Sequence, residues 1–190
     1  MTIIKNYNYS EKEISTFIVD TTNEKLWIAF ESDGSNCVLK KVSSNDPLQV
    51  YFDIDVPVTE IKKLFISGTY IYLAYNDATY IGARKSLANP TITYTNISLP
   101  AGIVEAPVDI IVGSLGVFFL IPGNDSGTNA KVVKFSITGV YDQTIDLSTI
   151  RNAKSITVDS NDDLWVVTTS SPLEYVRVFL DGTWQFQSFT

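Results

Sequence analysis

Short runs of apolar residues alternate with turn-forming residues along the whole chain, and the runs recur in a fixed order. The clearest copy pairs Phe17-Ile18-Val19-Asp20 and Leu26-Trp27-Ile28-Ala29 with Ile156-Thr157-Val158-Asp159 and Leu164-Trp165-Val166-Val167. Two weaker copies lie between them, at 64–67 with 71–74 and at 110–113 with 117–120. Runs rich in β-branched and aromatic residues, bounded by Gly, Asn, Asp and Ser, predict β-strands joined by turns.

Two sets of landmarks show that the copies follow a regular period. An aromatic residue marks the second run of each copy, and the spacings are 45, 46 and 47 residues: Trp27, Tyr72, Phe118 and Trp165. The residues that end the first run are 47, 46 and 46 apart: Asp20, Ser67, Gly113 and Asp159. Each repeat of about 46 residues has room for four strands, in the first copy 16–20, 25–31, 37–43 and 48–56.

The apolar pattern within one repeat predicts how its strands are covered. The two inner runs are nearly continuous in apolar residues, whereas the outermost run alternates, which is typical of strands covered on two faces and on one face respectively. We therefore predict an all-β fold, a four-bladed β-propeller of four-stranded antiparallel blades, forming a single domain over residues 1–190. The expected blades are approximately 14–57, 61–100, 107–148 and 154–190. A β-sandwich would not need this period, and β-solenoid coils are usually shorter.

At Leu26-Trp27 and Leu164-Trp165, each after a turn containing Asn or Asp, the chain resembles the blades of regulator-type and NHL-like propeller repeats of bacteria. This resemblance implies a propeller and, for those families, a binding or scaffolding surface. It carries over no catalytic residue.

The N-terminal residues add one strand more than four blades need. Residues 6–10 are in phase with the outer strands, since Tyr7 precedes Ile54 by 47 residues. We predict that residues 1–10 form an extra closing strand beside the last blade, which would protect a sheet edge. The rival hypothesis is that this strand pairs with another subunit, and two chains sharing one larger ring is a third arrangement.

Composition narrows the range of functions. The net charge of −7 and the pI of about 4.5 repel phosphate, so we expect no nucleic-acid partner. No apolar run reaches the ~20 residues of a membrane span. The N-terminus lacks signal-peptide features, so we expect a protein made in the cytoplasm. With no histidine and one cysteine, Cys37, we expect no disulfide, cofactor or enzyme activity.

One segment resembles a calcium loop, because Asp159, Asn161 and Asp163 give its D-x-N-x-D beginning. Leu164 and Ser170 stand where such a loop needs Gly and Glu, so a turn is the better interpretation and we predict no metal. Cys37 is interpreted as a packing residue.

Recognition is expected at the connections that follow the second and fourth strands, because these meet on one face of a propeller. The longest is 122–129. The candidate contact residues are Asp33, Asn36, Tyr80, Asn124, Asp125 and Asn129. The recurring aromatic residues are predicted to pack between blades, whereas those that do not recur are expected to be partly exposed: Tyr70, Tyr75, Tyr80, Tyr94 and Trp184.

The function predicted from these patterns is a non-catalytic protein-interaction or structural module. Its composition is similar to that of virus-particle proteins, which favours a bacteriophage tail, fibre or capsid-associated protein that binds other proteins or copies of itself within the virion. The alternative is a lectin-like propeller with a glycan receptor, although the non-recurring aromatics do not predict equivalent sugar sites. A carboxylate-based hydrolase or lyase is the least favoured class.

Overall fold

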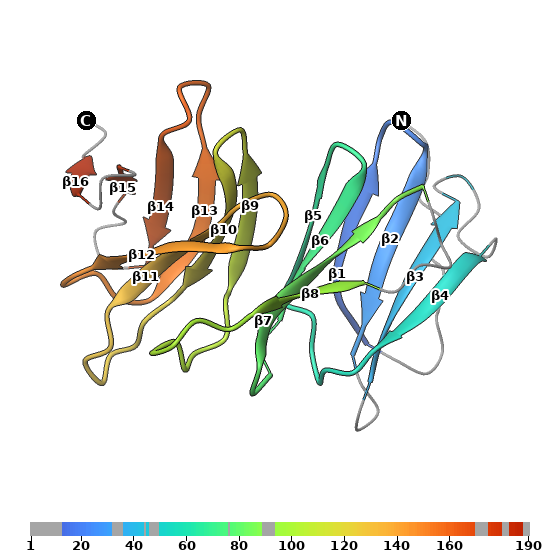
Figure 1. Cartoon of the computed structure of the whole chain (residues 1–190), viewed down its shortest axis with the longest axis horizontal. Coiled ribbons are helices and arrows are strands. Elements are labelled where there is room, and N and C mark those ends of the chain that lie inside the picture. The colour runs from blue at the N-terminus through green and yellow to red at the C-terminus, as the bar shows by residue number, and fades with distance from the viewer. Residues whose placement is uncertain are drawn as a thin grey trace. The chain divides into compact units, whose positions relative to one another are not determined.

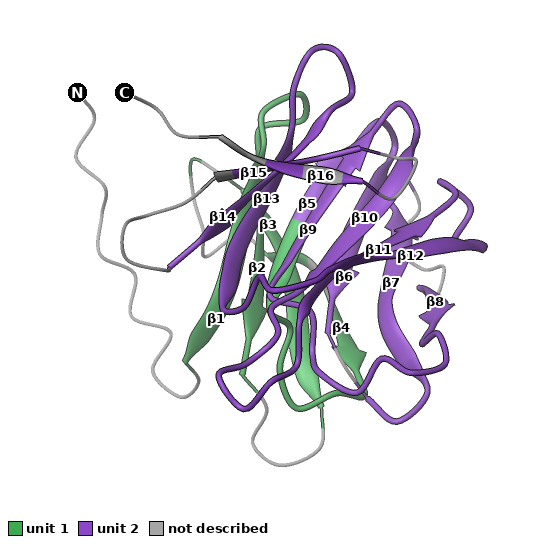
Figure 2. Ribbon diagram, turned by 90° about the vertical axis from the view of Figure 1, so that its left-hand side faces the viewer, with its two compact units in different colours: residues 1–64 green, residues 65–190 purple. Residues whose placement is uncertain are grey.

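The computed structural model describes residues 13–31, 36–43, 45, 50–75, 77–88, 94–169, 175–179 and 183–187. Regular structure within them is entirely β, and the strands form four sheets of four strands (Figure 1). Two compact units divide the chain, residues 1–64 and 65–190 (Figure 2). The described part of the chain has no helix long and apolar enough to cross a membrane.

The first unit holds one antiparallel sheet whose strands lie in chain order. They are β1 (Ile14–Asp20), β2 (Lys25–Phe30), β3 (Cys37–Ser43) and β4 (Val50–Val56). The first turn is closed by Asp20, whose carboxylate accepts hydrogen bonds from the backbone and side-chain nitrogens of Asn23 at 3.1 and 2.8 Å. Trp27, Cys37 and Leu39 are buried, as the interpretation of Cys37 as a packing residue requires.

The second unit contains three further sheets. The first strand of these sheets, β5 (Lys63–Ser67), begins two residues before the boundary of the unit. Each sheet again follows chain order. One contains β5 (Lys63–Ser67), β6 (Tyr70–Ala74), β7 (Tyr80–Ser86) and β8 (Thr95–Ser98). The next contains β9 (Asp109–Gly113), β10 (Gly116–Ile121), β11 (Ala130–Phe135) and β12 (Tyr141–Leu147). The last contains β13 (Ala153–Val158), β14 (Leu164–Thr168), β15 (Tyr175–Val178) and β16 (Trp184–Gln187).

Within the second unit, the sheet β9–β12 lies between the other two. One of its faces shares an apolar cluster with β5–β8, in which Tyr72 and Ala74 contact Ile110 and Phe119. Its other face shares a second cluster with β13–β16, in which Phe118 packs with Ile156 and its neighbours. Sheets that are apolar on both faces need cover on both faces, and the central sheet receives it.

A buried carboxylate reinforces the second of these interfaces. Asp109, at the start of β9, accepts hydrogen bonds across the interface from Ser155 Oγ at 2.7 Å and from the backbone nitrogen of Ile156 at 3.0 Å. Its other oxygen accepts one from Ile110 N at 2.9 Å. These bonds connect β9 directly to β13 of the neighbouring sheet, so they fix the position of one strand relative to the other.

The close approach of β7 to its neighbours explains one glycine. A Cβ on Gly82 would lie 2.3 Å from the carbonyl oxygen of Leu73 and 2.8 Å from the ring of Phe119. Only a residue without a side chain fits there, because real Cβ atoms do not approach backbone oxygens so closely.

The predicted all-β fold with a repeated four-stranded sheet is confirmed. The finer prediction, a closed four-bladed ring, is not confirmed, since the described residues show no closed ring. The expected closing strand, residues 1–10, lies outside the described residues.

The recurring aromatic residues do not all have the expected surroundings. Trp27, Tyr72 and Phe118 are buried as predicted. Trp165 is only half-buried, which corrects the prediction for this position. Its indole nitrogen donates to Asp159 at 3.0 Å, and the guanidinium of Arg177 lies 5.8 Å from the ring centroid. The sheet β13–β16 therefore presents this aromatic on a partly open face.

Candidate recognition face

In an antiparallel sheet, the connections after the second and fourth strands lie at the same end. In the second unit we call this end the loop face, and it comprises residues 75–79, 99–108, 122–129, 148–152 and 169 where the structure describes them. Side-chain hydrogen bonds join the connections of neighbouring sheets there. The loop face is therefore braced and does not consist of independent loops.

Asn124 organises the longest connection. Its side-chain oxygen accepts hydrogen bonds from Ser126 N at 3.0 Å and Thr128 N at 3.3 Å, as Asn commonly does in turns. Its amide nitrogen donates to the carboxylate of Glu105, in the preceding connection. Asn124 is half-buried, so this predicted contact residue shapes the loop.

Asp125 links the connections of two neighbouring sheets. Its carboxylate is exposed and accepts a hydrogen bond of 2.5 Å from the side-chain nitrogen of Asn152, which has a positive φ of 53°. The backbone supports the same junction, because Ala153 N donates to Pro122 O at 3.0 Å. Thr169 Oγ1 then donates to Asn152 O at 3.3 Å.

Asn129 closes the far end of the longest connection. Its amide nitrogen donates to Asp146 at 3.2 Å, and its side-chain oxygen accepts from Thr149 N at 3.4 Å. Thr149 has a φ of 77°, a left-handed conformation that costs a β-branched residue energy. The bond from Asn129 helps to hold this conformation in place.

One apolar side chain, Val104, lies exposed among the polar residues of the loop face. Val104 is 81% exposed, more than any other large apolar side chain in the described residues. Its connection is tied down on both sides, by Glu105 to Asn124 and by Lys131 Nζ, which donates to Gly102 O at 3.5 Å. Sequence reasoning did not single out Val104, because one valine in an irregular loop forms no pattern.

The remaining candidate contact residues do not join this braced group. Asn36 is half-buried just before β3 in the first unit, and Asp33 lies outside the described residues. Tyr80 is half-buried at the start of β7, where its backbone nitrogen donates to Asp77 at 2.6 Å. Sequence reasoning thus placed three of its candidates, Asn124, Asp125 and Asn129, in the braced group.

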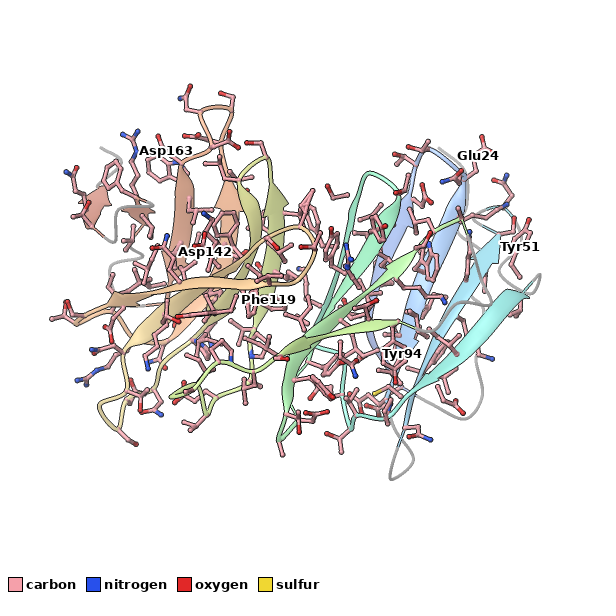
Figure 3. All side chains as sticks on the ribbon, viewed as in Figure 1. Glu24, Tyr51, Tyr94, Phe119, Asp142 and Asp163 are labelled. Carbon is pink, nitrogen blue, oxygen red and sulfur yellow. The ribbon has the colours of Figure 1, made fainter. Side chains whose placement is uncertain are left out.

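A set of tyrosines lies on the sheet β5–β8. Tyr75 was expected to be partly exposed, which is wrong: it is buried and its hydroxyl donates to Asn96 at 2.9 Å. Burial raises the pKa of Tyr75, and Tyr94, Asp77 and Tyr80 raise it further. Tyr94 (Figure 3) is half-buried, and its pKa is raised by burial and by Asp77.

Tyr70 is half-buried as expected. The side chain of Trp184 lies outside the described residues.

The calcium-like segment forms a turn at the opposite end of its sheet from the loop face. Asp159 accepts hydrogen bonds from Asn161 N at 2.8 Å, Asp163 N at 3.0 Å and the indole of Trp165, which is the main cause of its lowered pKa. Asp163 (Figure 3) forms an ion pair with Arg177. Among the described residues, no group of three or more His, Cys, Asp or Glu side chains could hold a metal ion.

Comparison with known proteins shows which solved structures have a similar fold. No family model matches the sequence, and no curated protein matches it. Among solved structures, the chain is similar to streptogramin B lyase, with a TM-score of 0.69 and 14% identity, covering 97% of this chain and 57% of the lyase. It is also similar to a structure from work on two prolyl endopeptidases, with a TM-score of 0.62 and 11% identity, covering 93% of this chain and 26% of that one. The fold is therefore propeller-like.

These similarities correct one prediction. The expectation that the chain is not an enzyme is contradicted, because the first of these structures is a lyase and the second an endopeptidase. Structures with a similar fold include enzymes, so the fold does not argue against catalysis. At these identities the likeness shows the fold alone. The chain spans little more than half of the lyase.

Proposed function

We propose that this chain is a recognition module that binds a protein partner through the loop face of the second unit. The observation that carries the proposal is Val104, an apolar side chain that is 81% exposed on a connection tied down on both sides. Single exposed apolar residues are common on protein surfaces. Val104 differs because both of its neighbours in the chain are anchored: Ile103 is buried and its backbone nitrogen donates to Pro100 O at 3.3 Å, and the Glu105 carboxylate accepts a hydrogen bond from Asn124.

Pre-organisation is what makes such a residue useful in binding. A loop that is ordered before association loses less conformational entropy when the partner binds, so more of the contact energy contributes to affinity. An apolar centre with a polar rim is also the usual composition of a protein interface. Here Asp125 and Ser126 are exposed polar residues of the neighbouring connection.

The surrounding carboxylates and amides define the chemistry of the partner. Glu105, Asp125 and Asp146 all lie on or beside the loop face, and the whole chain carries a net charge of −7. We therefore infer a partner surface with an apolar pocket bordered by lysine, arginine or backbone N–H donors. The predicted virus-particle setting rests on sequence composition and the predicted glycan receptor on the expected propeller and its aromatic residues, and both stay predictions.

The proposal is tested by site-specific photo-crosslinking in an extract of the source cells. A benzophenone amino acid at position 104 should capture a defined partner, whereas the same probe at Thr138 should not. Thr138 is the matched control because it is exposed in the β11–β12 turn, at the opposite end of the sheet.

Competition makes the test specific for the loop face. Excess unlabelled protein should abolish the crosslink at 104, and the Val104→Asp variant should compete at least tenfold less well, since a charge would enter the apolar pocket. Equal capture at both positions, or equal competition by the two proteins, would contradict the proposal.

A further inference from the structure

The repeat allows equivalent positions in different sheets to be compared, and one position behaves differently in the first sheet. Phe17 of β1 is equivalent to Ile110 of β9 and Ile156 of β13. The two isoleucines are 1% and 4% exposed, whereas Phe17 is 64% exposed. The larger apolar side chain is therefore the uncovered one.

The exposure of Phe17 belongs to a strip along β1. Ile14, Phe17 and Val19 oppose Phe30, Ile28 and Leu26 in the register of β1 and β2, so all six side chains lie on one face of the sheet. Ile14 and Val19 are 49% and 50% exposed. We call Ile14, Phe17 and Val19 the β1 strip.

The later sheets show what this face does. In β9–β12, Ile110 and Val112 pack against Tyr72 and Ala74 of the sheet that precedes it in the chain. In β13–β16, Ile156 and Val158 pack in the same manner against Phe118 and Leu120 of its preceding sheet. The face that carries the β1 strip is thus the one that docks onto a preceding sheet, and the described residues include no sheet before β1.

In the last sheet, β13–β16, it is the other face, the one that a following sheet would cover, that is partly open. Trp165 and Val167 of β14 are equivalent to Phe118 and Leu120, and Thr157 of β13 is equivalent to Ile111. In β9–β12 these positions are covered by the sheet that follows. In β13–β16, Trp165 and Val167 are half-buried and Thr157 is exposed, and no described sheet follows it. This partly open surface is called the β14 face.

We propose that a second copy of this chain covers the β1 strip with its β14 face. The contact continues the arrangement that already joins β9–β12 to β13–β16, with the same faces and equivalent residues. The contact is head-to-tail, and its smallest closed form is a pair of copies joined by two such contacts, one in each direction; this pair is the assembly that we propose.

The proposal does not depend on the loop face, because its residues lie on the faces of the sheets and not on their connections. Light scattering at several concentrations gives the first readout. The expected mass is twice 21.1 kDa at micromolar concentrations. A mass of 21.1 kDa at every concentration up to the millimolar range would overturn the proposal.

Charge variants test which surfaces meet. Ile156 and Ile111, the equivalents of Phe17 and Thr157, share one cluster, so Phe17 of one copy should face Thr157 of the other. Phe17→Lys and Thr157→Glu each place a charge in both contacts of the pair, and each should weaken dimerisation at least tenfold. Both positions are exposed in the single chain, so we expect folding to be preserved, which circular dichroism checks.

Mixing the two variants gives the decisive result. A mixed pair has one lysine–glutamate contact and one unchanged contact, so the mixture should form dimers where neither variant does alone. The matched control is Val140→Lys, which introduces the same charge at an apolar residue that is 66% exposed elsewhere. A mixture that stays monomeric, or a Val140→Lys protein that dissociates as readily as Phe17→Lys, would overturn the proposal.

Discussion

At the scale of single residues, several polar side chains in this protein form hydrogen bonds with backbone only a few residues away. Asp20, Asn124 and Asp159 each close a turn by accepting backbone hydrogen bonds. Asp and Asn in turns could be predicted from sequence, because this bonding is local. The partners of Glu105 and Asn152 could not, since they lie 19 and 27 residues away and depend on how neighbouring sheets pack.

Gly82 gives a direct test of packing between sheets. Replacing it with Ala would place a methyl group against Leu73 O and the Phe119 ring, so we expect a loss of about 1–3 kcal/mol in unfolding free energy. Gly113→Ala is the control, because its added Cβ would meet atoms no nearer than 3.4 Å. Urea denaturation of both variants measures the difference. Equal loss of stability in the two variants would argue against close packing at Gly82.

Tyr75 predicts a response to alkaline pH. Its folded-state pKa is raised, so the folded protein holds the phenolic proton more tightly than the unfolded chain. This contribution is fully present below the ordinary tyrosine pKa of about 10 and is lost as pH rises above it.

The expected result is that native protein titrates fewer tyrosines near pH 10 than urea-unfolded protein, measured by phenolate absorbance, because burial raises the pKa values of Tyr72 and Tyr94 as well as that of Tyr75. Tyr75→Phe should reduce this difference by one tyrosine. It should also flatten the decline in stability above pH 10. An unchanged difference in the variant would show that another tyrosine is responsible.

At the scale of elements, the strands were the most predictable part of the protein. Apolar runs with turn residues at both ends gave β2, β9, β10 and β14 to within about two residues, because strand formation here follows the local pattern. The pattern could not distinguish a buried inner strand from one that borders an open face. Trp27 and Trp165 both follow a leucine and precede a β-branched residue, yet Trp27 is buried and Trp165 is only half-buried.

The bonds of Asp109 across two sheets make an element-scale prediction. Asp109→Ala would leave the backbone nitrogen of Ile156 without its acceptor in a buried interface, which costs about 1–3 kcal/mol. Asp142→Ala is the matched control, since that carboxylate is half exposed and pairs with Lys134 near the surface. Amide hydrogen exchange should show faster exchange in β13 for the first variant only. Uniformly faster exchange would instead indicate general destabilisation.

At the scale of the whole molecule, the sequence predicted the number of sheets but not how they are completed. The 46-residue repeat can be read from the sequence alone. Whether the sheets close into a ring depends on which sheet faces meet. The regularly spaced aromatic and strand-end residues would be the same in a closed and in an open arrangement, so they could not decide it. The candidate site was predicted as a loop face, and Val104 within it only emerged from the three-dimensional bracing. The prediction that the chain is not an enzyme was overturned because structures with a similar fold include enzymes, and a missing histidine removes only one of several possible acid–base groups.

The burial of Cys37 has a practical value for all of these questions. It is the single thiol of the chain, and its burial shields it from reagents. A cysteine introduced at an exposed position would therefore take a maleimide dye almost alone, with no need to remove the native one. Fluorescence energy transfer between dyes on separate molecules could then follow copies as they meet.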